Sequence, residues 1–357
     1  MLRVAVIPGD GIGPEVTGEA CRVLARAATL AGKELRLETF DYGAERYLRD
    51  GVALPEEALI RFRTEFDALL LGAVGDPRVP DNRHAREILL GLRFGLDLYC
   101  NVRPVKLLDR RLTPLRDRTE EDIRFTVFRE NTEDLYAGVG GTFKRGTEDE
   151  IAIEESISTR KGVTRIIEAA FHYATSRGET KVTMADKGNA LRYSGDLWAR
   201  TFDEVGRRHP GIEREHLYVD ALALELVLHP GRFRVIVTAN LFGDILTDLA
   251  AALQGGLGVA PSGNIHPGRV SMFEPVHGSA PDLAGRGCAN PVGAILSAAM
   301  LLEHAGWSAE ASAVERSVAS CVRAGRSTRD LGGRLGTREV GDAVVEALDL
   351  AWADPKH

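Results

Sequence analysis

Short apolar runs alternate with longer segments of helical periodicity along the chain. Leu2 to Ile7 and Leu35 to Phe40 have the pattern of buried strands, and Glu15 to about Leu30 has that of a helix. A helix around Glu56 to Phe66 leads to a third strand at Ala68 to Gly72. This β-α-β order predicts a largely parallel sheet covered by helices, an α/β fold.

The same alternation continues to the C-terminus. We predict strands at Arg124 to Arg129, Lys181 to Ala185 and Val235 to Ala239, and helices at Arg160 to Ser176, Gly195 to Arg208 and Phe242 to Leu253. Three more helices are predicted at about Val292 to His304, Ala309 to Ala324 and Arg338 to Ala351. Because no linker, repeat or low-complexity segment interrupts the chain, we expect two domains joined through the sheet.

One segment does not follow this alternation of strands and helices. Gly138 to Ile157 contains Gly-Gly and Gly-Thr turn signals and the alternating stretch IAIEESIS, which together predict a projecting β-arm. Such an arm leaves edge hydrogen bonds unpaired unless it meets a partner. Pairing with the same arm of a second copy is the simplest solution, so we expect a homodimer.

Composition and charge narrow the class of protein. Of the 357 residues, 44% are hydrophobic and 27% charged, and the formal net charge is −7, which argues against nucleic acid as a partner. The N-terminus lacks the apolar core of a signal peptide, and the longest apolar run, about Val292 to Leu302, is too short to span a bilayer. We therefore expect no membrane association. Free buried thiols in a cytoplasmic protein are expected for the four cysteines, Cys21, Cys100, Cys288 and Cys321.

Two motifs carry residues suited to chemistry. PGDGIGPE, Pro8 to Glu15, follows a predicted strand and opens a helix, which suits either a tight structural turn or a turn facing a nucleotide. In NLFGDILTDL, Asp244 and Asp248 are four residues apart and share one helix face. These carboxylates are either solvated or neutralised by a hard cation such as Mg²⁺ or Mn²⁺. The apolar character of the helix favours the cation.

Single polar residues add further candidates. Asp220 ends a predicted strand in LYVDALAL, where it is either a helix N-cap or a third carboxylate of the site. Lys187, in MADKGN, is either solvated or, near a metal, a base with a lowered pKa. Arg93, Arg103 and Arg129 would bind a dicarboxylate if they converged and otherwise lie at the surface.

Taken together, these motifs resemble the β-decarboxylating dehydrogenases, the family of isopropylmalate, isocitrate, homoisocitrate and malate/tartrate dehydrogenases. The matching segments are GDGIGPEV, LDLYCNVRPV, FRENTEDLYAG, MADKGN, YVDALAL, NLFGDILTDLAA and FEPVHGSAPDLAGRGCANP. The likeness runs from about Arg3 to Leu348 and its motifs are highly specific.

The resemblance implies an isopropylmalate dehydrogenase-like fold that is distinct from the Rossmann fold. A cofactor-binding domain would combine residues 1–99 and 255–357, and a substrate and dimerisation domain, 100–254, would carry the arm at about 138–158. The active site would lie between the domains and be shared across a homodimer.

The resemblance also implies residue roles. Tyr136, Lys187 and Asp220 would be catalytic. Asp220, Asp244 and Asp248 would bind Mg²⁺ or Mn²⁺, with Asp220 donated by the neighbouring subunit. The substrate would contact Leu89, Leu90, Arg93, Arg103 and Arg129. NAD would contact Gly11, Ile12, Glu274, His277, Gly278, Ser279, Ala280, Asp282 and Asn290.

In the implied reaction, Lys187, directly or through Asp220 or water, takes the 2-hydroxyl proton of a small 2-hydroxy dicarboxylic acid while hydride moves from C2 to NAD. Carbon dioxide then leaves, the divalent ion stabilises the enolate, and Tyr136 protonates the carbon. A non-catalytic regulatory subunit would be expected to lack one of these residues, and all of them are present here.

Two short stretches of the sequence favour one cofactor and one substrate. Asp282 stands where NAD-dependent members place an acidic residue, and it would repel the 2′-phosphate of NADP. The recognition helix, Arg86 to Arg93, has Glu87 and Leu89 where isocitrate enzymes place serine and asparagine. Leu89 and Leu90 instead form an apolar wall that suits 3-isopropylmalate. D-malate or tartrate is the alternative, because those enzymes share the Leu-Leu pair.

Overall fold

The computed structural model describes residues 1–353, which form two compact units. The first contains Met1–Leu98, Pro104–Ile123 and the chain from Ala251 on, and the second contains Tyr99–Arg103 and Arg124–Ala250. The first unit thus includes residues 104–123, which our sequence interpretation had placed in the middle domain. Leu108 explains the difference, because it is buried in the hydrophobic core of the first unit.

The first unit is built on five strands in the order β2-β1-β3-β12-β11, of which only the β11–β12 pair is antiparallel. The strands are β1 (Leu2–Gly9), β2 (Leu35–Thr39), β3 (Ala68–Ala73), β11 (Pro261–Ile265) and β12 (Ser271–Pro275). Its α-helices are α1 (Gly13–Leu30), α2 (Ala44–Asp50), α3 (Glu56–Glu65), α4 (Arg83–Gly95), α9 (Val292–His304), α10 (Ser308–Arg323) and α11 (Thr337–Ala353).

The central strands of this unit are apolar at successive positions because both faces of the sheet are covered. Val4 and Val6 of β1 pack into a core with α1, α9, α10 and α11, whereas Ala5 and Ile7 pack into a second core with α3 and α4. Side chains alternate between faces along a strand, so a strand buried on both sides reads as one continuous apolar run. This confirms the predicted parallel, helix-covered sheet.

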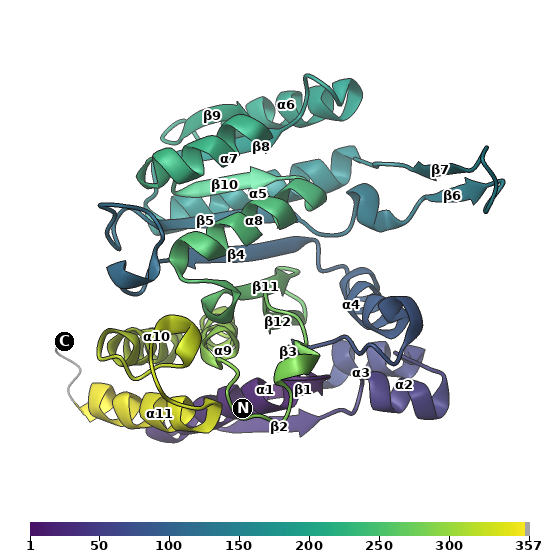
Figure 1. Cartoon of the computed structure of the whole chain (residues 1–357). Coiled ribbons are helices and arrows are strands. Elements are labelled where there is room, and N and C mark those ends of the chain that lie inside the picture. Colours follow the sequence, from purple (N-terminus) through teal and green to yellow (C-terminus); the bar gives the residue numbers. More distant parts are fainter. Residues whose placement is uncertain (354–357) are drawn as a thin grey trace. The chain divides into compact units, whose positions relative to one another are not determined.

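The second unit contains four parallel strands in the order β5-β10-β8-β9. These are β5 (Arg124–Glu130), β8 (Lys181–Asp186), β9 (Glu213–Tyr218) and β10 (Val235–Thr238), with the part of β4 (Cys100–Lys106) up to Arg103 beside β5. The α-helices are α5 (Arg160–Arg177), α6 (Arg192–Gly206), α7 (Val219–Leu228) and α8 (Asn240–Gln254). Figure 1 shows α5 behind these strands and α8 in front of them.

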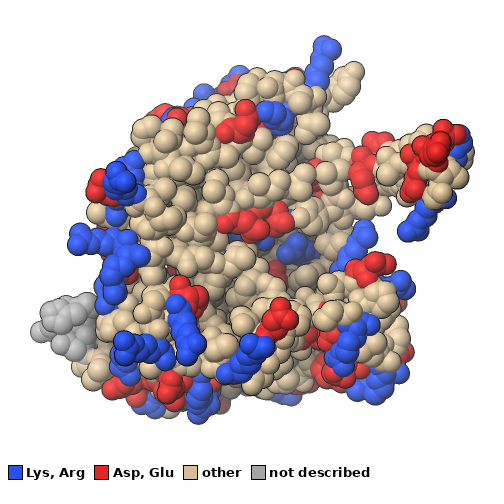
Figure 2. Space-filling view, viewed as in Figure 1, with Lys and Arg blue, Asp and Glu red and all other residues tan. Residues whose placement is uncertain are grey.

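The predicted arm is present as an antiparallel hairpin of β6 (Gly140–Phe143) and β7 (Ile151–Glu154), which forms a separate two-stranded sheet. The hairpin extends away from the rest of the second unit, and all residues of both strands are exposed (Figure 1). In Figure 2 it stands out as a projection that carries acidic and basic side chains. Its role at a dimer interface stays a prediction.

Two smaller observations bear on the sequence interpretation. Within residues 1–353, the model contains no helix with the length and hydropathy needed to cross a membrane. The four cysteines are free, as predicted, but Cys288 is exposed and not buried. Its position in the loop before α9 explains this exposure, since half-buried Cys21 and buried Cys100 and Cys321 all lie within helices or strands.

Candidate active site

Three side chains from separate parts of the second unit meet at Asp244 on α8. Arg103 Nη2, from β4, lies 3.2 Å from Asp244 Oδ1, and Arg129, at the end of β5, forms an ion pair with the same oxygen. Tyr136 donates its hydroxyl hydrogen to Asp244 Oδ2 across 2.7 Å. Arg103, Arg129, Tyr136 and Asp244, four of the residues predicted for the site, are therefore adjacent in one unit.

The local sequence around α8 makes this approach feasible. A Cβ atom on Gly243 would lie 2.5 Å from Arg129 Cγ, so only glycine lets that arginine cross the helix here. Arg129 Nε donates to Asn240 Oδ1 at 2.9 Å. Arg103 is held by Asn101 Oδ1 at 2.8 Å and by Thr247 Oγ1 at 2.6 Å. Both arginines are buried, so these contacts fix their orientation.

Asp248 lies one turn further along α8, with 60% of its side chain exposed and its Oδ1 4.0 Å from Arg103 Nη1. Partial burial, and then the negative charge of Asp244, raise the pKa of Asp248. The pKa of Tyr136 is also raised, first by burial and then by its hydrogen bond to Asp244, so the phenol keeps its proton at neutral pH. The site thus combines two neighbouring carboxylates with a protonated phenol.

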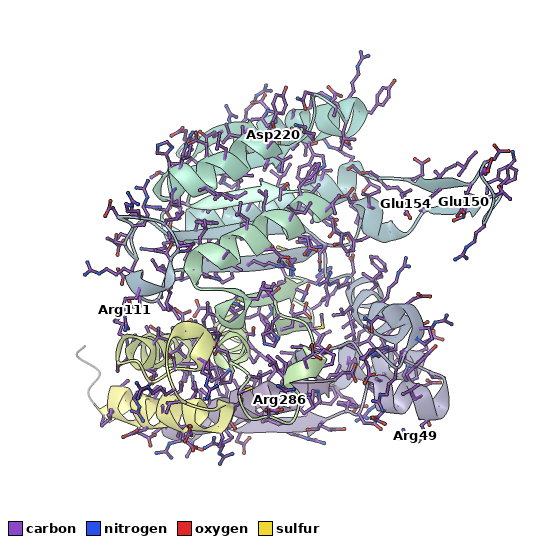
Figure 3. All side chains as sticks on the ribbon, viewed as in Figure 1. Arg49, Arg111, Glu150, Glu154, Asp220 and Arg286 are labelled. Atoms are coloured by element: carbon purple, nitrogen blue, oxygen red, sulfur yellow. The ribbon has the colours of Figure 1, made fainter. Side chains whose placement is uncertain are left out.

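Lys187 and Asp220 form a second group in the same unit. Lys187 follows the end of β8 and forms an ion pair with Asp220, and this hydrogen bond lowers the pKa of the carboxyl group. Buried Asp186 fixes the turn, because its Oδ1 accepts from Gly188 N at 3.0 Å and lies 2.9 Å from His216 Nε2. Figure 3 labels Asp220 on α7.

The position of Asp220 corrects one interpretation of the sequence. We had placed Asp220 at the end of a strand or at a helix N-cap, but β9 ends at Tyr218 and Asp220 lies in the first turn of α7, where Tyr218 is the N-cap residue. The alternation in LYVDALAL conceals a helix start, since the apolar residues continue without a break.

The three predicted metal ligands do not meet within one chain. Across residues 1–353, no three His, Cys, Asp or Glu side chains are grouped closely enough to hold a metal ion. Asp244 and Asp248 are neighbours on α8, whereas Asp220 pairs with Lys187 on α7. Within this described part of the chain, no third ligand of these types joins the Asp244–Asp248 pair.

The first unit presents a third predicted substrate arginine on α4. Arg93 is buried, and its Nη2 donates to Glu274 Oε1 at 3.2 Å. Its Nε is also buried and has no hydrogen-bond partner among the described residues. A buried donor without a partner is costly, and an incoming carboxylate would relieve that cost. Leu89 and Leu90, on the same helix, are half-buried.

A cavity of about 490 Å³ in the first unit contains several residues predicted to contact the cofactor. Predicted residues in its lining are Ile12, His277, Ala280 and Asn290. The sequence interpretation missed Gly258, Leu283, Arg286, Cys288, Ala289, Arg329 and Asp330, which also line it. Figure 3 labels Arg286. Gly258, Arg329 and Asp330 lacked a signal because they lie in short 3₁₀ turns with no helical or strand period. The other four fall within the family-matching stretch FEPVHGSAPDLAGRGCANP but were not singled out there.

His277 gives this cavity a defined polarity. Its Nδ1 lies 3.0 Å from the carbonyl oxygen of Gly278, so Nδ1 is assigned the hydrogen and Nε2 a lone pair. Burial lowers the pKa of His277, which keeps the ring neutral. Nε2 is buried and has no hydrogen-bond partner among residues 1–353. It is therefore available to accept from a ligand donor such as an exocyclic amine.

The remaining predicted cofactor residues surround the cavity without lining it. Gly11, with φ +57°, packs so closely on Ser279 that a Cβ atom would overlap the Ser279 carbonyl oxygen, which also accepts from Ile12 N at 2.8 Å. Asp282 lies in an exposed 3₁₀ turn, Gly278 is exposed, and Glu274 is the penultimate residue of β12. The glycine turn is thus a structural turn and, at the same time, one wall of the cavity.

Comparison with known proteins agrees with this architecture. Residues 3–344 match the family described as isocitrate/isopropylmalate dehydrogenase. The fold is that of a dehydrogenase of this class, and the chain belongs to this family.

Named relatives narrow the comparison. The chain is 49% identical over 350 residues to the 3-isopropylmalate dehydrogenase of Corynebacterium glutamicum, covering 97% of this chain and 99% of that protein. It is 46% identical to the enzyme of the same name from Thermobifida fusca, covering 97% and 98% of the two chains.

Solved structures agree as well. Isocitrate dehydrogenase from Methylococcus capsulatus matches with a TM-score of 0.88 at 37% identity, covering 98% of this chain and 99% of that one. A β-decarboxylating dehydrogenase from Thermococcus kodakarensis matches with a TM-score of 0.81, also at 37% identity, covering 99% and 98%.

Proposed function

We propose that this protein catalyses the NAD-dependent oxidative decarboxylation of 3-isopropylmalate to 2-oxo-4-methylpentanoate and CO₂, the leucine-biosynthesis reaction. The observation that carries the proposal is the convergence of Arg103, Arg129 and Tyr136 on Asp244, one turn from Asp248. Relatives that bear the name 3-isopropylmalate dehydrogenase over nearly the whole chain support the choice of acid.

The carboxylate pair fits a hard divalent cation. Asp244 and Asp248 offer oxygen ligands, and partial burial, followed by the negative charge of Asp244, raises the pKa of Asp248, a cost that a cation would relieve. These two carboxylates would hold Mg²⁺ or Mn²⁺, which would supply Lewis-acid polarisation of the 2-hydroxyl and stabilise the negative charge that develops on decarboxylation.

The arginines supply the recognition of a dicarboxylate. Arg103 and Arg129 have their guanidinium groups fixed and buried beside Asp244, where they can bind substrate carboxylate oxygens as donors. Arg93 offers a buried Nε for a further carboxylate oxygen. Leu89 and Leu90 are the apolar surface proposed for the isopropyl group.

Proton transfer is assigned to two residues. Lys187 in its ion pair with Asp220 is an ammonium, so it first passes a proton to Asp220, which orients it, or to water. The neutral amine then takes the proton of the 2-hydroxyl as hydride leaves C2 for the nicotinamide. Tyr136 holds a proton that it can deliver to the carbon from which CO₂ has departed, and Arg103 and Arg129 keep its partner Asp244 in place. Because Lys187 and Asp220 are paired within one chain, a site that takes Asp220 from a neighbour takes Lys187 from it too.

A second copy of this chain is the proposed source of that pair. Leu224 on α7 and Ile245 on α8 expose 58% and 60% of their surface, and Phe143 on the hairpin exposes 62%. These apolar side chains lie on the elements that carry Asp220, Asp244 and the arm. A homodimer would bury them and would complete each Asp244–Asp248 pair with the Asp220 and Lys187 of the other copy.

NAD is assigned to the cavity of the first unit. Neutral His277 offers Nε2 as an acceptor for the amine of adenine, and Asn290 and Ile12 line the same space. Exposed Asp282 can accept from ribose hydroxyls and would repel a 2′-phosphate. This polarity fits NAD better than NADP.

D-malate or tartrate is the second candidate substrate. The stretch RGTEDEIAIEESISTRKGV is more like that of D-malate and tartrate enzymes, and FRENTED departs from the commonest isopropylmalate pattern. The Leu89–Leu90 pair is common to both classes. A pocket that gains one or two methylene contacts with a substrate favours it by only about 1–3 kcal/mol. The apolar surface of Leu89 and Leu90 alone therefore discriminates weakly between 3-isopropylmalate and D-malate or tartrate.

One assay tests the proposed function. Purified protein with Mn²⁺ and NAD would be given 3-isopropylmalate, D-malate, tartrate and isocitrate in parallel, and NADH formation measured. We expect the highest kcat/KM with 3-isopropylmalate, a strong preference for NAD over NADP, and loss of turnover in excess chelator. Faster turnover of D-malate would favour the second candidate, and chelator-resistant turnover would contradict the metal assignment.

A further inference from the structure

A buried carboxylate, Asp10, connects four segments of the first unit. It lies in the glycine turn between β1 and α1. Its Oδ1 accepts from the backbone N of Ala44 at 2.6 Å, where α2 begins. Its Oδ2 accepts from the backbone N of Gly75 at 2.9 Å and lies 2.9 Å from Nε2 of His84 on α4.

His84 is fully buried in the first turn of α4. A carboxylate only accepts hydrogen bonds, so Nε2 carries the hydrogen and donates it to Asp10. The other ring nitrogen, Nδ1, has no hydrogen-bond partner in residues 1–353. The bond to Asp10 is therefore the one polar anchor of this ring in the described structure, and bonds to charged groups are among the stronger ones.

The chain needs such an anchor because the approach to α4 is irregular. Asp81 and Asn82, the two residues before the helix, have φ angles of +56° and +47°. Consecutive left-handed residues other than glycine cost free energy, and surrounding contacts must hold them in place. Asn82 Oδ1 closes the preceding loop by accepting from Asp76 N at 3.0 Å, and His84 attaches the helix itself to Asp10.

The two ends of this connection carry different parts of the proposed site. The glycine turn contributes Ile12 to the cofactor cavity, and its backbone N donates to Ser279. Helix α4 contributes Leu89, Leu90 and Arg93, the residues assigned to substrate. One carboxylate therefore fixes the turn beside the cofactor and the helix beside the substrate.

We propose that Asp10 and His84 are positioning residues that set the substrate helix α4 at a fixed distance from the cofactor turn. The proposal rests on the proposed function and adds to it a residue pair outside the catalytic group. A misplacement of about 1 Å between reacting groups can lower the rate by about 100-fold, so the bond matters to turnover although neither residue reacts.

The test compares three substitutions of His84 with one control. His84→Leu removes the donor, and His84→Asn keeps a polar group but is too short to reach Asp10, so it serves if the leucine variant does not fold. His84→Gln can place its amide nitrogen near the position of Nε2. The control is His304→Leu, which alters an exposed histidine of the same unit, one whose ring packs against Phe273 and which is not among the proposed site residues.

For His84→Leu and His84→Asn we expect kcat/KM for the hydroxy acid to fall about 10- to 100-fold, while the Kd for NADH stays within about twofold of wild type. His84→Gln should recover most of the loss. If His84 had a purely structural role, its variants would melt at a lower temperature and bind NADH at fewer sites per chain. Their KM for the acid and their Kd for NADH would not change. The same result is expected for the control.

Unchanged kcat/KM in both the leucine and asparagine variants would overturn the positioning role. Parallel losses of substrate and NADH affinity would overturn it as well, because the cofactor cavity should survive the change. If the wild-type protein oxidises none of the four acids, the proposed function is wrong and the positioning role is refuted with it. Activity in wild type and in His84→Leu alike would refute the positioning role alone.

Discussion

Asp244 accepts contacts from three side chains that lie far from it in the sequence: Arg103, Arg129 and Tyr136. Without a cation, the two buried arginines neutralise this carboxylate, and Asp248 remains the less compensated of the pair. The two aspartates therefore contribute differently to stability, although both are assigned to the same metal.

A substitution of Asp248 should affect turnover without lowering the stability of the metal-free protein. Because Asp248→Asn removes a charge that repels Asp244, we expect the metal-free variant to melt at the same temperature as wild type or higher. Mn²⁺ should then raise the melting temperature of wild type but not of the variant, and turnover should be lost. Thermal melts with and without Mn²⁺ check this, and a large destabilisation of the metal-free variant would contradict it.

Tyr136→Phe tests the assignment of the acid. The ring lies over the Arg129 guanidinium, 5.0 Å from its carbon to the ring centroid, and phenylalanine preserves that contact. We expect kcat to fall by about 100-fold or more, with KM for the acid and the melting temperature little changed. Steady-state kinetics measure the effect, and a kcat within a factor of three of wild type would remove Tyr136 from the mechanism.

At the scale of elements, the sequence predicted those parts whose local pattern and packing agree. β3 is apolar at every position and β1 from Val4 to Ile7, because both faces of these strands are buried, and the apolar run of α9 shows the limits of that helix plainly. β11 was missed, since Pro261, Ser262 and Gly263 have no strand propensity and are held by pairing with distant β12.

In the site, too, local features could be predicted from the sequence and contacts between distant residues could not. The spacing of Asp244 and Asp248 indicated a shared helix face, because that is a local property of an α-helix. The approach of Arg103 and Arg129 to Asp244 depends on the order of β4 and β5 and on a missing side chain at Gly243. Only the family resemblance could supply those contacts before the structure did.

Gly243→Ala tests that dependence on one missing side chain. The new Cβ would meet Arg129 Cγ, so we expect kcat/KM to fall at least about tenfold even though alanine favours helix formation. Gly18→Ala on α1 is the matched control, because no atom lies within 4 Å of its Cβ position, and it should stabilise the protein by about 0.5–1 kcal/mol with normal kinetics. Normal activity in the Gly243 variant would mean that Arg129 adjusts without cost.

At the scale of the whole molecule, the proposed active site needs residues from a second copy of the chain. The pair Lys187–Asp220 and the pair Asp244–Asp248 lie apart in one chain, and no three potential ligands gather anywhere in residues 1–353. Exposed apolar side chains on α7, α8 and the hairpin indicate where the copies would meet.

Ile245→Asp probes that surface. Placing a charge at an apolar interface should shift the protein toward monomers and reduce turnover in proportion, because a monomer lacks half of each site. Ile60→Asp on α3 is the matched control, since Ile60 is also exposed, at 55%, but lies in the first unit. Light scattering at several concentrations measures the mass, and an active monomer would contradict the shared site.

Mixing two inactive variants tests the central claim most directly. Asp220→Asn would inactivate the residues that a chain contributes to its partner's site. Asp248→Asn would inactivate the residues that a chain contributes to its own site. If sites are shared, subunits exchanged in equal amounts form hybrids with one intact site, and activity should return to about one quarter of wild type. A mixture that exchanges subunits, as mass spectrometry would show, yet stays as inactive as either variant alone would contradict the account.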